Sequence, residues 1–436
     1  MMRSVKVMLT GGVAALVTAP AAFAADLPVA KSAPVEYVRV CSTHGEGFFY
    51  VPGTDTCIRL SGYVRADFGY AQPKGATVVE TDDFGNVTGV WKNGRTQDAT
   101  GSHIRARLEV DTRTPTEYGT VRAFLRYEIE KNTGIFDASD NGALLDHAYI
   151  QWAGFTAGRV TSFFDFYAND LNFGNGFEGS FGSDVSTNLF AYTATFGEGF
   201  SASIAIEDGN ERRTNADFYD AAGQRMPDVV ANVNIQQDWG TAQLSGALHQ
   251  LNSATINAPW GGNWGQRVDT TYGWAVQGGV KLDLSKIAAG DVLWLQAAYA
   301  DGALNYIGVG DIAYANYASF VTDGAIVNGD IKKTSGWNAT AAFLHYWTPT
   351  VRQSLFGSYT GVTYDRAVRA DFADLRNFDA WTVGSNVIWS PVSAFDIGVE
   401  VLYSKVERKA FQNEVLLRGL KSEDAVTGRL RFKREF

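Results

Sequence analysis

The feature that most constrains the fold is an alternating run of charged and uncharged residues between His103 and Glu130. From His103 to Arg113 every second residue is ionisable, and mainly apolar residues lie between them. A short turn containing Pro115 and Gly119 follows, and the alternation then resumes up to Glu130. A period of two residues is typical of a β-strand whose two faces differ. The run therefore predicts a β-hairpin with one apolar face and one charged face.

Two kinds of fold accommodate such a hairpin. In a soluble β-sandwich the charged face meets water and the apolar face meets the core. In a transmembrane β-barrel the apolar face meets lipid and the charged face lines a water-filled lumen. The hairpin alone does not distinguish these folds, but the rest of the chain does.

Length and composition favour one large all-β unit. A chain of 436 residues would ordinarily suggest two or three soluble domains, but no Pro-, Ser- or charge-rich linker divides it. Tyr, Phe, Trp and Gly are abundant, and strand-like segments continue to the last residue. The alternation predicts 16 strands. They lie near residues 58–71, 103–113, 121–130, 144–152, 155–163, 188–196, 200–208, 229–238, 241–251, 272–284, 291–301, 337–347, 351–361, 381–389, 395–406 and 425–436.

The connections alternate between short turns and long polar loops. The long loops lie at residues 72–100, 132–142, 164–187, 209–227, 252–270, 302–335, 362–379 and 407–422. An up-and-down barrel produces this alternation when one rim carries tight turns and the other carries long loops. A Greek-key sandwich gives no reason for it. The expected fold is therefore an all-β, antiparallel, 16-stranded transmembrane barrel.

Four tryptophans favour the same interpretation. Trp152, Trp239, Trp347 and Trp389 each stand at, or one residue from, the end of a strand that enters a short turn. Indole rings prefer the level of the lipid headgroups, where barrels carry aromatic girdles. The alternative is chance placement near strand ends, and four placements at the same rim favour the girdle.

The first 24 residues have the features of an export signal. Arg3 and Lys6 form a basic start, an apolar stretch follows, and Ala22-Phe23-Ala24 predicts cleavage between Ala24 and Ala25. Removing this segment makes a chain of net charge −10 still more acidic, which argues against nucleic acid as a partner. No later segment has 18 uninterrupted apolar residues, so we expect no membrane-spanning helix.

The exported chain contains two cysteines, Cys41 and Cys57. In an oxidising compartment they predict a disulfide. A zinc site is the alternative, but two thiols without a convincing set of further ligands make a poor one. We expect no metal and no cofactor.

The last strand has an apolar face and a largely basic face, and it ends in Phe436. An amphipathic strand with a terminal aromatic residue resembles the signal that the bacterial barrel-assembly machinery reads. We therefore expect that machinery to be a partner of this chain through Phe436.

Five N-terminal segments carry a more specific resemblance. They are Ala25–Pro28, Pro34–Cys41, Gly47–Tyr50, Pro52–Cys57 and Gly62–Asp67. In these segments the chain resembles the alphaproteobacterial general porins. The resemblance implies a homotrimer of 16-stranded barrels in the Gram-negative outer membrane, each with its own diffusion pore. It also implies that the third long loop folds inward and narrows each pore. We expect outer-membrane lipid and lipopolysaccharide as partners of the barrel.

The expected organisation follows from these observations. Residues 1–24 form the cleaved signal, residues 25–57 form a segment on the periplasmic side with the disulfide, and residues 58–436 form the barrel. Closure puts the last strand beside the first, which gathers arginines on one side of the lumen. This predicted basic wall comprises Arg65, Arg105, Arg107, Arg126, Arg429 and Arg431, with Arg159 added on less regular alternation.

The third long loop carries four acids, Asp165, Asp170, Glu178 and Asp184, among Phe and Gly residues. Folded inward, it would set these carboxylates against the arginines across a narrow aqueous constriction. The resulting field favours polar solutes over apolar ones. The alternative is that the loop only caps the outer rim and its acids are solvated.

The predicted function is passive diffusion of small polar solutes and ions, with a weak cation preference because the acidic loops dominate the net charge. No G-x-S-x-G, H-E-x-x-H or Walker A motif is present, and a Gly-x-Gly-x-x-Gly match at 174–179 lies in a loop. We therefore expect no enzymatic activity. The alternatives are a solute-selective porin, for example for sugars, and a plugged structural or adhesin barrel.

Overall fold

The computed structural model describes residues 39–73, 76–81, 87–93, 95, 97–136, 142–174, 181–214, 216–254, 268–309, 321–372, 375–409 and 422–436. Residues 40–436 form one compact unit. The predicted signal, its cleavage site at Ala24 and Ala25, and Glu178 lie outside the described residues.

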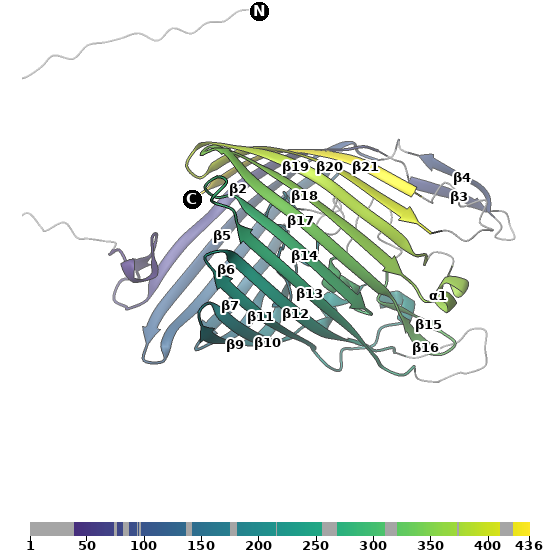
Figure 1. Cartoon of the computed structure of the whole chain (residues 1–436), viewed down its shortest axis with the longest axis horizontal. Helices are drawn as coiled ribbons and strands as arrows, with labels where there is room; N and C mark the ends of the chain where they lie inside the picture. Colours follow the sequence, from purple (N-terminus) through teal and green to yellow (C-terminus); the bar gives the residue numbers. More distant parts are fainter. Residues whose placement is uncertain are drawn as a thin grey trace, which may run out of the picture. The chain divides into compact units, whose positions relative to one another are not determined.

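Sixteen strands of the described chain form a closed antiparallel barrel, which confirms the predicted fold (Figure 1). Closure comes from pairing of the last strand with the first, for example Phe68 opposite Leu430. The barrel strands are β2 (Cys57–Ala71), β5 (Thr100–Thr116), β6 (Gly119–Gly134), β7 (Gly142–Trp152), β8 (Phe155–Thr161), β9 (Ser186–Gly197), β10 (Phe200–Glu207), β11 (Asp228–Gln237), β12 (Gly240–Leu251), β13 (Thr271–Asp283), β14 (Val292–Asp301), β17 (Ser335–Thr348), β18 (Val351–Thr363), β19 (Phe378–Val392), β20 (Phe395–Arg408) and β21 (Ser422–Glu435).

Short elements lie at both ends of the barrel. At the short-turn end β1 (Phe49–Tyr50) pairs with β2, next to η1 (Ser42–His44). The long connections contain the hairpins β3 (Ala76–Thr81)–β4 (Val87–Asn93) and β15 (Gly324–Val327)–β16 (Asp330–Lys333). They also contain the short helices η2 (Gly209–Arg212), η3 (Ala216–Tyr219), η4 (Leu304–Ile307) and α1 (Arg366–Asp371). Within the described residues, no helix is long and apolar enough to cross a membrane.

The two hairpins lie in segments that the sequence pattern predicts as loops. The β15–β16 turn has a clear local cause: Asn328 and Gly329 both adopt positive φ, at 54° and 89°. An Asn-Gly pair accepts this conformation easily, and it matches the twist of two paired strands. The hairpin therefore forms inside a long connection without joining the barrel sheet.

The apolar side chains of the barrel strands point outward. Leu108, Leu125 and Val399 are 45%, 39% and 51% exposed on the outer face, whereas their neighbours Arg107 and Arg126 turn inward. This polarity confirms the lipid-facing assignment of the apolar face and excludes the soluble sandwich.

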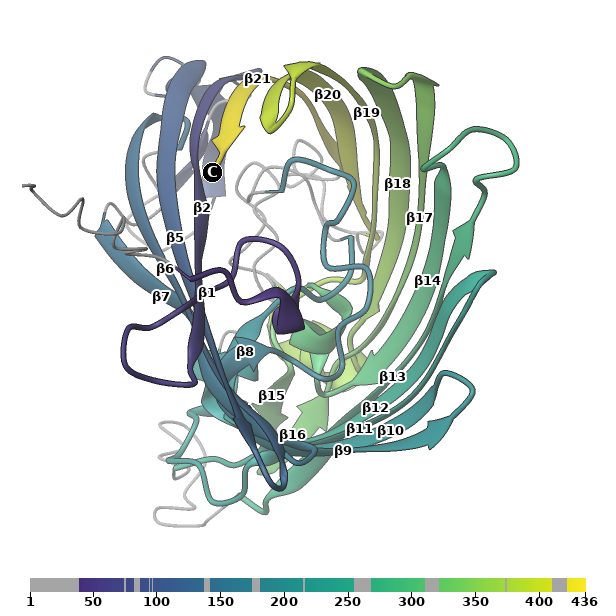
Figure 2. The ribbon, with the colours of Figure 1, turned by 90° about the vertical axis from the view of Figure 1, so that its left-hand side faces the viewer.

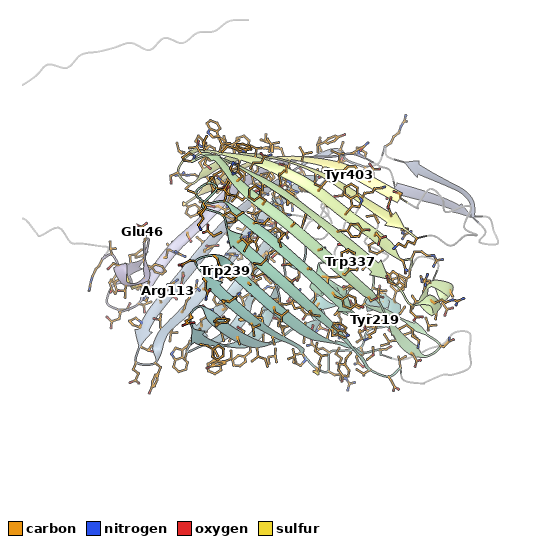
Figure 3. All side chains as sticks on the ribbon, viewed as in Figure 1. Glu46, Arg113, Tyr219, Trp239, Trp337 and Tyr403 are labelled. Carbon is orange, nitrogen blue, oxygen red and sulfur yellow. A yellow bond between two sulfur atoms is a disulfide. The ribbon has the colours of Figure 1, made fainter. Side chains whose placement is uncertain are left out.

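Aromatic side chains lie on the apolar outer face toward both ends of the barrel (Figure 3). Trp239 stands near the short-turn end, and Trp337 and Tyr403 stand toward the long-loop end. The four predicted girdle tryptophans are all exposed, between 40% and 64%. Their placement agrees with an aromatic girdle at the short-turn rim.

A hydrophobic core lies inside the barrel, where the long connections fold into the lumen. Its loop members include Phe164, Leu304, Tyr306, Tyr364 and Leu375, all fully or nearly fully buried. They pack against small inward residues of β9–β14 and of β18–β20, largely alanines. Among the described residues, β17 and the strands β2, β5, β6, β7 and β21 contribute none to this cluster, but β17 supplies Ala342 to a second cluster that contains Tyr167 of the third loop. The strands β2, β5, β6, β7 and β21 therefore lie outside both clusters.

The N-terminal part of the unit is closed by a disulfide between Cys41 and Cys57, which confirms that prediction. Both sulfur atoms are used in the bond, so these residues do not form the alternative zinc site. Phe48 packs against the bonded cysteines in a small buried cluster. The disulfide therefore fixes η1 and β1 next to the start of β2.

Candidate functional site

Six predicted arginines converge on adjacent strands at the lumenal face. Strand pairing sets Arg65 opposite Arg105 across β2 and β5, and Arg431 opposite Asp67 across β21 and β2. We call Arg65, Arg105, Arg107, Arg126, Arg429 and Arg431 the arginine wall. The two-residue period puts alternate residues of each strand on this face, and closure of the barrel brings β21 to β2.

Carboxylates of β5, β6 and the neighbouring strand β7 hold the guanidinium groups apart. Arg105 Nη1 lies 3.0 Å from Glu128 Oε2. Arg126 Nε donates to Glu109 Oε1 at 2.7 Å, and its Nη1 donates to Asp146 Oδ2 at 3.3 Å. Charge-assisted bonds of this kind fix direction as well as distance. The arginine wall is therefore a cross-linked lattice rather than a loose set of like charges.

Arg159 lies apart from the arginine wall. Its strand register sets it opposite Ala148 and the exposed Asn188, whereas the inward positions of β8 are occupied by residues such as Thr156. The guanidinium donates to the carbonyl of Leu145 at 3.1 Å and to Glu211 Oε1 at 2.7 Å. The structure thus gives Arg159 a different role from the one the sequence pattern suggested.

The described parts of the third long loop, residues 162–174 and 181–185, lie inside the barrel (Figure 2). Its first part is bound to β12, β13 and β14 by a row of glutamines. Gln277 Nε2 donates to the carbonyl of Phe164 at 2.9 Å, and Gln296 Oε1 accepts from the amide of Tyr167 at 2.9 Å. Gln243 Nε2 donates to the carbonyl of Asp165 at 3.1 Å. Side chains of the barrel thereby satisfy the polar backbone of an inward loop.

The next part of the third loop reaches the opposite strands. Asn386 Nδ2 donates to the carbonyl of Leu171 at 2.8 Å, and Glu400 Oε2 accepts from the amide of Phe173 at 2.8 Å. Arg431 Nη2 donates to the carbonyl of Phe173 at 2.9 Å, with its guanidinium 4.1 Å from the Phe173 ring centre. Arg429 Nη1 donates to the carbonyl of Gly174 at 2.5 Å. Two members of the arginine wall therefore hold the loop backbone.

The loop acids divide into two groups. Asp165 is fully enclosed: its Oδ1 lies 3.4 Å from Nη2 of Arg212, and neither side chain is exposed. Asp165 thus pairs with a neighbouring loop and not with the arginine wall, contrary to the expectation for it. Asp170 and Asp184 are exposed, and Asn169 Nδ2 donates to Asp184 Oδ2 at 3.1 Å.

Asp184 occupies an unusual electrostatic environment. Enclosure by the barrel removes part of its solvation although it still contacts lumenal water, and the carboxylates of Asp165 and Asp146 lie nearby. Enclosure first, and then repulsion from these carboxylates, raise the pKa of Asp184 to about 6. This carboxylate therefore changes charge near neutral pH.

The sequence analysis did not identify the residues that anchor the third loop. Gln243, Gln277, Gln296 and Asn386 are neutral, and their only local signal is an inward position in an alternating strand. No sequence pattern marks Arg212 as an anchor, because its partners Asp165 and Asn305 lie far from it in the sequence.

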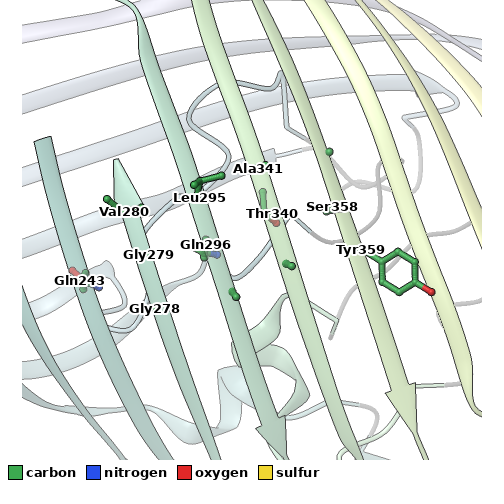
Figure 4. A pocket seen from close by; sticks show the side chains of 13 residues that line it. Gln243, Gly278, Gly279, Val280, Leu295, Gln296, Thr340, Ala341, Ser358 and Tyr359 are labelled. Atoms are coloured by element: carbon green, nitrogen blue, oxygen red, sulfur yellow. The ribbon is translucent and has the colours of Figure 1, made fainter. Parts of the chain in front are cut away.

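A hollow of about 840 Å³ lies on the outer face of β13, β14, β17 and β18 (Figure 4). Val280, Leu295 and Tyr359 stand in front of the strands, whereas Gln243 and Gln296 lie behind them. Small residues such as Gly278 leave space between these side chains. The outward side chains around the hollow are apolar, and polar residues of its lining such as Gln243 and Gln296 turn to the lumen, where they bind the third loop, so the lumenal face is the candidate functional site.

Comparisons with known proteins agree with this geometry. A family model described as "Porin subfamily" matches residues 26–429. The chain is 31% identical over 383 residues to Porin Omp2b of Brucella abortus, and the match covers 80% of this chain and 98% of that protein. Porin Omp2b of Brucella suis matches with the same identity and coverage.

Solved structures show the same fold. The outer membrane channel DcaP of Acinetobacter baumannii superposes with a TM-score of 0.66 at 19% identity, covering 89% of this chain and 99% of that one. The trimer form of in-vitro folded OmpT of Vibrio cholerae gives a TM-score of 0.52 at 10% identity, covering 87% and 99% of the two chains. At these identities the likeness concerns the fold alone.

Proposed function

The chain belongs to the porin family and forms a general diffusion channel in the outer membrane, and from that premise we propose the path that solutes take. Small polar solutes and ions pass between the third loop and the members of the arginine wall other than Arg429 and Arg431, which hold the loop. The observation that carries this proposal is the one-sided filling of the barrel. The loops pack onto the small residues of β9–β14 and β18–β20, while β2, β5, β6, β7 and β21 stay outside that core.

The constriction works by fixed charge. The guanidinium groups of the arginine wall are charged at every physiological pH, and carboxylates hold them in place. On the other side, Asp170 and Asp184 present the exposed acids of the third loop. A polar solute can exchange its hydration for these groups, whereas an apolar solute only displaces ordered water. The channel therefore favours hydrophilic solutes without a catalytic step.

The test is neutralisation of Arg65, Arg107 and Arg126 to Gln in one protein. We expect altered single-channel conductance in planar bilayers and a reversal potential shifted toward cations, because three positive charges leave the path. The matched control is Arg434→Gln, whose residue is exposed on the apolar face and donates to the carbonyl of Ser393. Wild-type conductance and wild-type ion preference in the triple variant would contradict the proposed path.

The same premise extends to the processing of the chain. We propose that residues 1–24 are removed on export and that residues 25–57 lie on the periplasmic side, with the barrel in residues 58–436. The position of η1 and β1 at the short-turn end supports this orientation. An N-terminal sequence beginning at Ala25 in protein from outer membranes would support it, whereas retention of Arg3 and Lys6 would contradict it.

We also propose a homotrimer in contact with outer-membrane lipid and assembled through the signal at Phe436. A porin-fold structure solved in trimer form supports the trimer by fold. Bilayer insertion should then raise the current in groups of three equal steps. Single isolated steps from the native protein would contradict a trimer.

A solute-selective channel is the second candidate, and one contact favours it. Phe124 and Tyr149 stack at the lumenal face with ring centres 5.3 Å apart. Because Phe124 is only 8% exposed and lies under Arg122, the partly exposed Tyr149 ring is the surface offered to a sugar ring. Liposome swelling with sugars of increasing size separates the two candidates. A smooth decline with size supports general diffusion, and saturation by one sugar supports a binding site. A plugged barrel would give no steady conductance at all.

A further inference from the structure

A second hollow, with a mixed polar and apolar lining, lies away from the constriction at the periplasmic rim. Its volume is about 500 Å³, and it is lined by residues of β5 to β9, by His44 of η1 and by the β7–β8 turn with the exposed Trp152 and Phe155. The side chains that matter most are Arg113, Arg122, Gln151, Thr156 and Thr193. No Asp or Glu is among the described residues that line it. The hollow therefore presents guanidinium, amide and hydroxyl donors to whatever enters it.

The guanidinium groups at this rim outnumber the carboxylate that holds them. Arg113 Nη2 and Arg122 Nη2 donate to Asp111 Oδ2 at 2.9 and 3.0 Å, and Arg59 Nη2 lies 3.8 Å from the same oxygen. The Asp111 side chain is buried, with 1% exposed, whereas the side chains of the three arginines are 26% to 37% exposed. One negative charge thus faces three positive ones, and the cluster has a net positive charge directed to water.

Aromatic rings position these arginines. Phe48 of the disulfide-closed segment packs against both Arg59 and Arg113, with 5.0 and 4.7 Å from guanidinium carbon to ring centre. Arg122 lies over Phe124 at 5.2 Å. Cation–π contacts and the bonds to Asp111 reduce the freedom of the side chains, so little entropy is lost when a ligand binds. Figure 2 shows the N-terminal segment in front of the lumen at this end.

From these contacts we propose that the periplasmic hollow binds small organic anions with two or more carboxylate or phosphate groups. Arg113 and Arg122 bind Asp111 through Nε and Nη2, and Nη1 of Arg122 also donates to Gln151 Oε1 at 3.1 Å. The N–H bonds that take no part in these contacts are the donors for such groups, and Thr156 and His44 are also among the lining residues. The volume lies in the range of small-molecule sites and exceeds what one inorganic anion needs. This inference rests on the proposed function, because the site lies where solutes leave the constriction. It adds a preferred solute class to general diffusion.

The test uses the whole protein in planar bilayers with citrate as the probe. We expect citrate added on the periplasmic side to reduce the KCl current in a saturable way. The double variant R113Q R122Q should conduct but need citrate concentrations higher by about tenfold or more for the same reduction. The matched control is Arg352→Gln. That arginine pairs with Asp396 at the same end but on other strands, and citrate block should stay at the wild-type level.

Two further measurements test the proposed anion site even if the double variant R113Q R122Q folds poorly. Gln151→Leu leaves the bonds of Asp111 in place and should weaken citrate block several-fold. Calorimetric titration of citrate into purified wild-type protein should show saturable binding. Unchanged block in a conducting R113Q R122Q protein, or no saturable binding to wild type, would overturn the site while leaving the diffusion channel intact. Failure of the wild-type protein to conduct would instead count against the proposed function.

Discussion

Arg431 of the last strand and Asp67 of the first strand form a two-bond ion pair across the seam where the barrel closes. Nε lies 2.7 Å from Oδ1 and Nη2 lies 2.8 Å from Oδ2, and the Asp67 side chain has no exposed surface. Arg65 Nε also lies 3.4 Å from this carboxylate. The seam thus joins strands that are more than 350 residues apart in the chain through one buried acid.

Arg431→Met should therefore destabilise the barrel, because it leaves a buried carboxylate with a weaker partner. Removing one member of a buried pair costs about 3–5 kcal/mol. The measurement is urea unfolding in detergent, followed by the mobility difference between folded and unfolded barrels. The double variant R431M D67N should regain part of the lost stability, since it removes the buried carboxylate. The recovery should be incomplete, because Arg65 loses its ion pair with Asp67. Equal stability of R431M and wild type would show that the ion pair does not hold the seam.

Val399 tests the polarity of the outer face. It is 51% exposed on β20 and lies opposite Leu430 in the register of the last two strands. Val399→Arg should lower the stability of the barrel in lipid by about 2–4 kcal/mol if the site lies near the membrane midplane. Val399→Leu, which keeps the surface apolar, should stay near wild type. A neutral effect of arginine would mean that this surface does not face hydrocarbon.

Asp184 should make ion selectivity depend on pH. Enclosure in the barrel and neighbouring carboxylates raise its pKa to about 6, so it is largely ionised at pH 7 and loses its charge as pH falls through 6. Because the folded pKa lies above the ordinary value, the ionised form disfavours folding. This penalty is fully present above the folded pKa and disappears as pH falls below the ordinary one. Cation preference should therefore decrease between pH 7 and pH 5.

The variants for this prediction follow from the neighbouring groups. Enclosure also raises the pKa of Asp170, so both loop acids titrate in the same direction. Asp184→Asn should remove most of the change in reversal potential, and D170N D184N should leave a nearly flat response. Glu211→Gln, whose carboxylate binds Arg159 away from the arginine wall, should keep the wild-type response. A full response in the double variant would mean that other groups carry it.

The sequence predicted the features that depend on local periodicity. The alternation from His103 to Glu130 is a property of neighbouring residues, and it gave both the strands and their faces correctly. The sequence pattern wrongly assigns Arg159 to the arginine wall. Strand β8 has only seven residues, and its pairing with β7 and β9 decides which of its side chains point inward. Nothing in the order of residues indicates that Asp165 meets Arg212, since folding of two separate loops creates that contact. The two-residue period of a strand predicts which side chains point into the lumen, but it does not predict which residues those side chains contact.

Arg212 provides the last test, because it joins three loops inside the barrel. It is fully buried, its Nη1 donates to Ser183 Oγ at 2.7 Å, and its guanidinium lies 4.4 Å from the Tyr306 ring centre. Arg212→Met should leave Asp165 buried without its cation, at a cost of about 3–5 kcal/mol. The substitution destabilises the packing of the loops and not the pairing of the strands. We therefore expect larger fluctuations of the single-channel current under conditions in which the barrel stays folded. Arg213→Met is the matched control, since Arg213 is less buried and donates to the carbonyl of Ala222. Quiet, wild-type single-channel traces from the Arg212→Met protein would show that the loops keep their positions without this residue.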